Sequence, residues 1–442
     1  MSIKNNILGI ALLFSYSLIA QEILTKKEAL AITLANNYGI RIANNDLKVA
    51  KNNASIYNSG FLPTVSTSAG ANYRRNSQNT IIQSETPIER NIEGAVTKSY
   101  NAAVNLNYTI FDGLGRRYNY KQLKERYNLT ELQAKATIEN TYLQLFTLYF
   151  QIARLSENTS NLATILKISK DRLKRAQYRY DYGQSSKLLL LNAEVDVNND
   201  SIAYVNTKQQ FTNAKRNLNI ILGTKKTSDY DVETEVNFST ILNYENLVAK
   251  SKTNNITIQQ NKKNLAINEF NIKVNKASYL PRLDLSSSYQ WSRSENPQTP
   301  FFDPSTTTAN GLNAGLNLTW NLFDGGATKT RVANSKIALE NQKIALELEE
   351  ETLQNNLKNT WEDYQNRLFI LKVQEQNVVT NQNNFDRTME QFKLGQINSI
   401  EFRQAQLNLL NAKASLNNAK YDAKLLELQL LQLSGDLLNT SF

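Results

Sequence analysis

The sequence contains neither cysteine nor histidine among its 442 residues. Without cysteine there can be no disulfide, thiolate metal site, cysteine nucleophile or lipidated N-terminal cysteine. Without histidine, the commonest general base and metal ligand are missing as well. A carboxylate-based hydrolase is the remaining enzyme class, and we find no arrangement of paired acids that would serve one. We therefore predict no catalytic residues, no metal site and no cofactor.

Proline and glycine are scarce, with 6 and 15 copies, and only 41% of the residues are hydrophobic. Few helix breakers combined with heptad spacing favour very long helices over compact globules. The net charge is +10, but the basic residues are scattered. They form no dense stripe with interleaved aromatics of the kind that nucleic-acid-binding proteins show. We therefore interpret the positive charge as an ordinary solvated surface and predict no nucleic-acid partner.

Residues 1–20 have the pattern of a secretory signal peptide. Lys4 is followed by a nearly continuous apolar run from Ile7 to Ala20, and the polar pair Gln21-Glu22 comes next. We expect cleavage after Ala20. The run is too short for a transmembrane anchor, and no later segment reaches 18 apolar residues. The protein is therefore predicted to be exported, and any membrane crossing would be made by strands.

The sequence is built twice. In the last helical stretch, Gln396–Ser434, apolar residues recur at an unbroken 3-4 spacing, which is the seam of a coiled coil. The same register occurs 212 residues earlier, where only Asp200 and Thr207 interrupt it. Internal repetition at this length indicates two fused copies of one half rather than a solenoid.

Short motifs confirm the repeat and locate a variable loop. Phe111-Asp112-Gly113 recurs as Phe323-Asp324-Gly325 with the same shift of 212 residues. Phe61-Leu62-Pro63 recurs as Tyr279-Leu280-Pro281, but with a shift of 218. The excess must lie between the proline and the second motif, so this segment contains a loop whose length differs between the halves.

After each proline, Pro63 and Pro281, the hydrophobic period changes to two. Each half then has two alternating runs, with one face apolar and ending in Tyr or Trp and the other face rich in Asn, Ser and Thr. The runs are long enough to cross a bilayer as tilted barrel strands. A half-buried soluble sheet is the alternative interpretation. We place the intervening loops at residues 74–99 and 292–311.

Four strands cannot close into a barrel, and an open sheet edge cannot lie in lipid. If the strands span a membrane, several chains must therefore combine them. Three chains would give twelve strands, an even number within the range of known outer-membrane barrels.

A long helix follows each strand pair. Asp112-Gly113 and Asp324-Gly325 precede the predicted helices Leu114–Tyr182 and Ala327–Leu394, and an aspartate at this place is suited to cap the helix N-terminus. Neither helix contains a proline. Gly183 and Gly395 then end the two helices, and the chain returns in the coiled-coil helices. The polar segment 224–244 links the halves, and we interpret it as a belt outside the helical bundle.

This order of features resembles the TolC family of outer-membrane efflux proteins over essentially the whole mature chain. The most specific parts are the two proline–strand–loop–strand–FDG blocks and the two turn segments, Arg179–Glu194 and Gln391–Gln406. The resemblance implies a mainly α-helical chain with a membrane β-barrel. It also implies a homotrimer with a shared 12-stranded barrel in outer-membrane lipid and a long periplasmic α-barrel of coiled-coil helices.

With this resemblance, the chain divides into nine parts. These are a signal peptide (1–20), first-half periplasmic helices (21–60), a strand pair (61–112) with an extracellular loop (74–99), a helical hairpin (113–223), an equatorial linker (224–244), second-half periplasmic helices (245–278), a strand pair (279–324) with an extracellular loop (292–311), a second hairpin (325–434) and a tail (435–442).

The resemblance also implies a gate at the periplasmic end of the tunnel. Members of the family narrow the tunnel with acidic side chains six and nine residues after the second turn glycine. Glu401 occupies the first of these positions, and Gln404 the second. A ring of three charges per trimer would therefore replace a ring of six. The comparable first-half position, acidic in much of the family, is Leu189 here.

The closed state of the best-known member uses ionic links between the turns. Their basic partner would fall at Ile397 here, while Phe392 keeps an aromatic position. The family's ionic lock is thus in doubt, and the sequence leaves open whether the closed gate is ionic or apolar. An apolar closure would use Leu188, Leu189, Ile397 and Ile400.

The resemblance finally implies partners and a function. The turns at Gly183, Gln184, Ser185, Gly395, Gln396 and Asn398 would dock onto a periplasmic adaptor protein that an inner-membrane pump feeds. The protein would be the passive exit duct of an efflux or type I secretion system, and the sequence does not separate drug, metal and protein cargoes. An exported coiled-coil scaffold without channel activity is the alternative, and it leaves the aromatic-ended strands unexplained.

Overall fold

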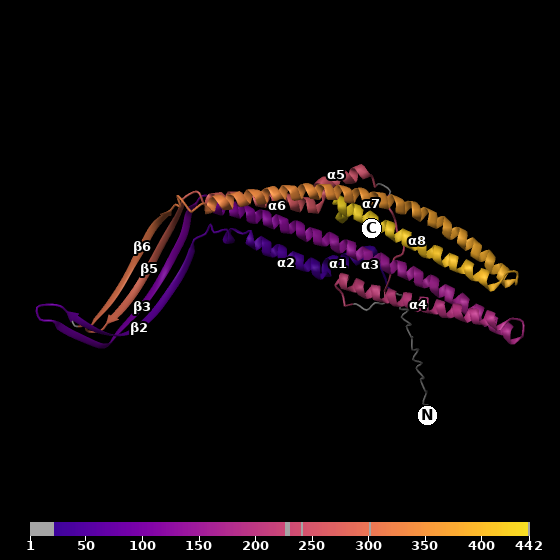
Figure 1. Cartoon of the computed structure of the whole chain (residues 1–442), viewed down its shortest axis with the longest axis horizontal. Helices are drawn as coiled ribbons and strands as arrows, with labels where there is room; N and C mark the ends of the chain where they lie inside the picture. Colours follow the sequence, from indigo (N-terminus) through magenta and orange to yellow (C-terminus); the bar gives the residue numbers. More distant parts are fainter. Residues whose placement is uncertain (1–21, 226–229, 240–241, 300–301, 441–442) are drawn as a thin grey trace, which may run out of the picture. The chain divides into compact units, whose positions relative to one another are not determined.

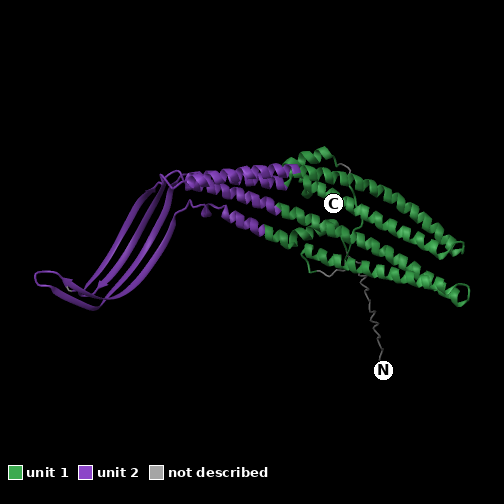
Figure 2. Cartoon of the chain, viewed as in Figure 1, with its two compact units in different colours: residues 1–43, 135–255, 352–442 green, residues 44–134, 256–351 purple. Residues whose placement is uncertain are grey.

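The structure is a computed structural model that describes residues 22–225, 230–239, 242–299 and 302–440. The predicted signal peptide, residues 1–20, lies outside the described residues. The chain forms two compact units (Figure 2). One contains the described parts of residues 1–43, 135–255 and 352–442, and the other contains residues 44–134 and 256–351 with their described parts.

The helices confirm the internal duplication. The two longest, α3 (Gly115–Asp181) and α7 (Ala327–Lys393), have 67 residues each and are shifted by 212. The return helices α4 (Lys187–Leu222) and α8 (Ser399–Ser434) have 36 residues each and the same shift. Among the described residues, no helix combines the length and apolar composition needed to cross a membrane.

The shorter elements follow the longer offset of 218 residues. They are α1 (Lys26–Asn36), α2 (Tyr38–Asn53) and the 3-10 turn η1 (Ile56–Asn58) in the first half, with α5 (Tyr244–Asn254) and α6 (Ile256–Ala277) in the second. A further 3-10 turn, η2 (Leu437–Asn439), follows α8. Because α1 and α5 already differ by 218, the six-residue excess is accommodated downstream of these helices, as the motifs predicted.

Four strands form one antiparallel sheet in the order β2 (Thr64–Ile82), β3 (Ile88–Asp112), β5 (Arg282–Asn296) and β6 (Ser305–Thr319) (Figure 1). The register puts side chains of one character on one face. Val104 pairs with Tyr289, which pairs with Leu312, whereas the neighbouring row runs from Asn105 through Ser288 to Asn313. The predicted apolar and polar faces are therefore confirmed.

The predicted loops at residues 74–99 and 292–311 are wrong in extent. Strands β2 and β3 stay paired as far as Ile82 and Ile88, and β5 and β6 as far as Asn296 and Ser305. Only residues 83–87 and 297–304 lie outside the strands. Polar side chains on both faces of these outer parts hide the two-residue period. The backbone ladder forms all the same, because its hydrogen bonds do not depend on side chains.

The junctions between strands and helices agree with the sequence prediction. Pro63 and Pro281 directly precede β2 and β5. The Asp112 carboxylate accepts a hydrogen bond from the Arg116 backbone N–H at 2.8 Å. The Asp324 carboxylate accepts one from the Thr328 N–H at 2.8 Å and another from the Thr328 hydroxyl. Both aspartates thus cap the long helices, and these bonds hold the pKa of Asp324 below its usual value. Gly113 lies against the backbone oxygen of Ala277, where a Cβ would come within 2.5 Å.

An aromatic cluster forms the core of the first unit. Tyr142, Phe146, Tyr149 and Phe150 follow one another on α3 and are almost completely buried. Tyr421 of α8 stacks on Phe150, with ring centroids 5.7 Å apart. Burial of these large side chains supplies most of the apolar contact between the two hairpins in this unit.

The linker 224–244 contributes to this core, which the sequence did not predict. Its strand β4 (Tyr230–Val232) pairs in parallel with β1 (Glu22–Leu24). Tyr230 and Val232 are buried. The Tyr149 hydroxyl donates to the Leu24 carbonyl at 2.6 Å and accepts from the Glu233 N–H at 2.9 Å. A three-residue strand in a polar, aperiodic segment carries too little pattern to be recognised from sequence.

Each return helix ends on a glycine that packs against a short helix. Gly223 and Gly435 have φ of +66° and +74°, a left-handed conformation that favours glycine. A Cβ on either would lie 2.4 Å from a backbone oxygen, that of Asn36 or that of Asn254. The duplicated halves therefore share one close backbone approach.

We predict that Gly435→Ala destabilises the chain more than Gly395→Ala. Both glycines have φ of +74°, but nothing lies within 4 Å of a Cβ at Gly395. The left-handed strain of about 1–2 kcal/mol is common to both changes. Only Gly435→Ala adds an overpacking cost of about 1–3 kcal/mol. Hydrogen exchange at the junction of α5 and α8, measured on full-length protein, compares the local opening free energies. Equal losses in the two variants would contradict the close approach.

Candidate functional site

The two hairpin turns are built alike. We name residues 183–186 the first tip and residues 395–398 the second tip. Gly183 and Gly395 have φ of +70° and +74°. The Gln184 N–H donates to the Arg179 carbonyl at 2.7 Å, and the Gln396 N–H donates to the Gln391 carbonyl at 2.9 Å. This is the Schellman pattern, in which a left-handed glycine satisfies the last carbonyls of a helix.

The polar tip residues differ in their environment. Gln184 and Gln396 are exposed and Ser185 is half-buried. Asn398 has a structural task, because its side-chain oxygen accepts hydrogen bonds from the N–H groups of Ile400 and Glu401, both at 2.9 Å. It is therefore the N-cap of α8.

The predicted gate residues are divided between surface and core. Glu401 and Gln404 are exposed, and the Gln404 side chain bonds to Asn408 at 2.8 Å. Phe392 stacks on Phe402, with centroids 4.7 Å apart and ring planes at 14°. The structure thus brings Phe392 into the core that joins α7 and α8 and leaves the two polar residues on the surface.

The predicted apolar closure is mostly not formed within one chain. Ile397 packs against the cluster around Phe402. Leu188, Leu189 and Ile400 are 65%, 42% and 70% exposed. Contacts among these three side chains remain a prediction about neighbouring copies.

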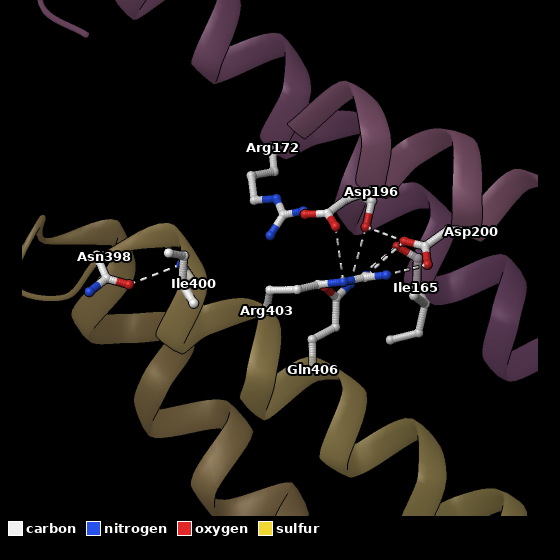
Figure 3. A network of polar contacts seen from close by, with 9 residues as sticks. Ile165, Arg172, Asp196, Asp200, Asn398, Ile400, Arg403 and Gln406 are labelled. Atoms are coloured by element: carbon white, nitrogen blue, oxygen red, sulfur yellow. Dashed lines mark hydrogen bonds and ion pairs between the residues drawn. The ribbon is translucent and has the colours of Figure 1, made fainter. Parts of the chain in front are cut away.

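A set of charges that the sequence did not identify joins the hairpins near the tips. We name Arg172, Asp196, Asp200 and Arg403 the charged cluster (Figure 3). The Arg403 guanidinium on α8 donates to both Asp200 carboxylate oxygens on α4, at 2.8 and 2.7 Å. Its Nε lies 3.5 Å from Asp196, which also pairs with Arg172 on α3. The cluster therefore links α8 to both α3 and α4.

Neutral groups complete the hydrogen bonding of the cluster. The Ser169 hydroxyl donates to Asp200 at 2.6 Å. The fully buried Gln406 accepts from Arg403 at 3.1 Å, and its amide nitrogen lies 3.4 Å from both the Ile165 carbonyl and the Ser169 hydroxyl. These bonds satisfy groups whose burial would otherwise be costly.

The cluster is electrically balanced and withdrawn from water. The side chains of Arg172, Asp200 and Arg403 are 4%, 6% and 14% exposed. Burial lowers the pKa of Arg172, and the neighbouring Asp196 opposes this shift. Removing one member of such a set leaves an uncompensated buried charge, which costs about 3–5 kcal/mol.

The sequence carried one sign of this site. Asp200 was one of two interruptions in the first coiled-coil seam, and its burial shows that it occupies the seam as a charge. Arg403 could not be assigned, because its partner lies 203 residues away and its own helix has a regular apolar seam beside it.

Comparison with known proteins identifies the family. Residues 29–224 and 247–436 match the family described as outer membrane efflux protein. The chain is 21% identical to outer membrane protein TolC of Vibrio cholerae over 384 residues, which covers 86% of this chain and 83% of that protein.

Two solved structures have the same fold. The CmeC outer membrane channel of Campylobacter jejuni gives a TM-score of 0.76 at 16% identity and covers 93% of this chain and 85% of its own. The outer membrane protein VceC of Vibrio cholerae gives 0.71 at 16% identity, with 92% and 95% covered. Because the family match spans most of both halves, this chain belongs to the outer membrane efflux protein family, as a TolC-like efflux channel of the outer membrane rather than an enzyme.

Proposed function

We propose that the protein is the passive exit duct of a three-component export system and works as a homotrimer. The observation that carries this is the two-faced sheet. Leu312, Leu316 and Leu318 on one face are 65–70% exposed, while Asn and Ser rows cover the other. Such a sheet suits lipid on one side and a wet lumen on the other. Three chains would pool twelve strands and pair every edge.

Exposed heptad stripes support the assembly of several copies. Val195, Ile202 and Val205 on α4 are 56–60% exposed and repeat at seven and three residues. Ile337, Ile344 and Leu348 on α7 are 56–65% exposed and repeat at seven and four. Stripes of this spacing are coiled-coil seams that lack a partner within the chain. We assign them to contacts between protomers in an α-helical tunnel.

The charged cluster is the proposed latch of the closed tunnel. It joins the first hairpin to the second within a short distance of both tips, so the two hairpins cannot separate while it is intact. An adaptor that favours a separated packing would have to break it and would thereby shift the population towards the open state. The inner-membrane pump, and not this chain, would supply the energy for transport.

We predict that Arg403→Gln opens the channel. The change leaves Asp200 buried without its main cation, so the closed packing loses about 3 kcal/mol or more. This corresponds to a shift of about 100-fold or more in the ratio of open to closed channels. The measurement is single-channel conductance of the full-length protein in planar bilayers, where more time in the high-conductance state is expected.

Two further variants make this test specific. Lys187→Gln removes an exposed cation near the first tip and should leave the conductance states unchanged. Glu401→Gln removes the proposed acidic ring; it should reduce preference for cations without changing the time spent open, because a charged ring focuses the field on passing ions. A closed Arg403→Gln channel would exclude the latch, and unchanged ion preference in Glu401→Gln would exclude the ring.

The tips are the proposed docking surface for a periplasmic adaptor. Gln184 and Gln396 are exposed beside the turn glycines, and both turns have open space around them. We therefore expect an adaptor to bind the two tips in the same way, as the duplication suggests.

We predict that Gln184→Trp combined with Gln396→Trp abolishes adaptor-dependent export. The bulky side chains keep both glycine turns but obstruct the surface. Co-purification with the cognate adaptor should fail while the oligomer stays intact. Gln376→Trp, at an exposed position on α7 away from the tips, is the matched control. Normal export by the double variant would mean that the adaptor docks elsewhere.

A further inference from the structure

A cavity lies beside the charged cluster, between α3 and the α7–α8 hairpin. Its volume is about 200 Å³. The stacked rings of Phe392 and Phe402 form one wall, and the half-buried Ile168 and Met389 contribute further apolar surface. An apolar wall of this kind favours a flat hydrocarbon or aromatic group.

The rim of the cavity is positively charged. Arg172 and Arg175 come from α3 and Lys393 from α7, while Asp171 is the one acidic side chain among the described lining residues. Arg175, Lys393 and Asp171 are exposed, so their fields are partly screened by solvent. Arg172 is the cation that lies inside the protein.

Arg172 has donors that remain unused. Its side chain is 4% exposed, and one terminal nitrogen, Nη2, pairs with Asp196. Nε and Nη1 are buried and have no hydrogen-bond partner among the described residues. In Figure 3 one nitrogen of the guanidinium meets Asp196 while another points away from that carboxylate. Unsatisfied buried donors are costly and uncommon, so an anionic acceptor next to Arg172 would be stabilised.

We propose that this cavity binds a small organic anion with an apolar body, such as an aromatic carboxylate. The carboxylate accepts hydrogen bonds from the free donors of Arg172, with Lys393 and Arg175 adding positive potential. The apolar body lies against Phe392, Phe402 and Met389. Charge-assisted bonds to a buried guanidinium give the site its preference for anions over neutral molecules of the same shape.

The position of the site gives binding a consequence. A molecule held by Arg172 on α3 and by Phe392 and Lys393 on α7 bridges the two hairpins. It therefore stabilises the packing in which the charged cluster is intact. This consequence rests on the proposed role of the cluster as a latch, whereas binding itself does not.

The test uses 4-(trifluoromethyl)benzoate as the probe and ¹⁹F NMR as the readout. Full-length protein is held in lipid nanodiscs, and empty nanodiscs measure partitioning into lipid. The matched neutral compound is 4-(trifluoromethyl)benzamide. We expect saturable binding of the benzoate, with affinity for the benzamide at least about tenfold weaker, which is about 1.4 kcal/mol.

Variants locate the site. Arg172→Gln removes the buried cation, and Met389→Trp fills the cavity; each should weaken benzoate binding at least about tenfold. Lys187→Gln, an exposed cation outside the cavity, is the matched control and should bind normally. Where Arg172→Gln does not assemble, Met389→Trp and the comparison of benzoate with benzamide decide the outcome.

Three results would overturn the proposal. They are the absence of saturable benzoate binding, equal affinity for benzoate and benzamide, and unchanged binding to a folded Arg172→Gln or Met389→Trp protein. The same samples in bilayers separate the two ideas. Benzoate binding without a decrease in channel opening would keep the site and reject its coupling to the latch.

Discussion

The pairing of backbone groups at the edges of the sheet is the constraint on which the rest of the structure depends. Among the described residues, β2 and β6 each pair with a strand on one side only. A membrane offers no water to satisfy the other side. The sheet must therefore continue into further copies, and this requirement fixes the roles of the exposed helix stripes, which would be faces between protomers rather than solvent-facing surface.

The charged cluster shows how fused duplicates become a mechanism. Each member has a different residue 212 positions away. Asp196 and Asp200 correspond to Asn408 and Ala412 in the second half, while Arg403 corresponds to Leu191 in the first. The first half thus supplies the acids and the second half supplies an arginine. Two identical halves would place like charges or none at this junction, so the latch exists only because the copies have diverged.

The sequence predicted what repeats and missed what meets. Helix lengths, the capping aspartates at 112 and 324, the glycine turns and the two faces of the sheet all follow from local pattern, and the structure has them. Loop extents were wrong, because polar strands lack a two-residue period. The strand β4 was missed because three residues carry little pattern. The pairing of Arg403 with Asp200 depends on tertiary contact between distant segments, which no spacing in one sequence contains.

The mass of the detergent-solubilised protein, measured by light scattering after membrane fractionation, tests the central claim most directly. Our account predicts a species three chains in mass, recovered from the outer-membrane fraction, because only combined sheets leave no edge unpaired. A water-soluble species of any size, or a stable monomer in the membrane fraction, would contradict it.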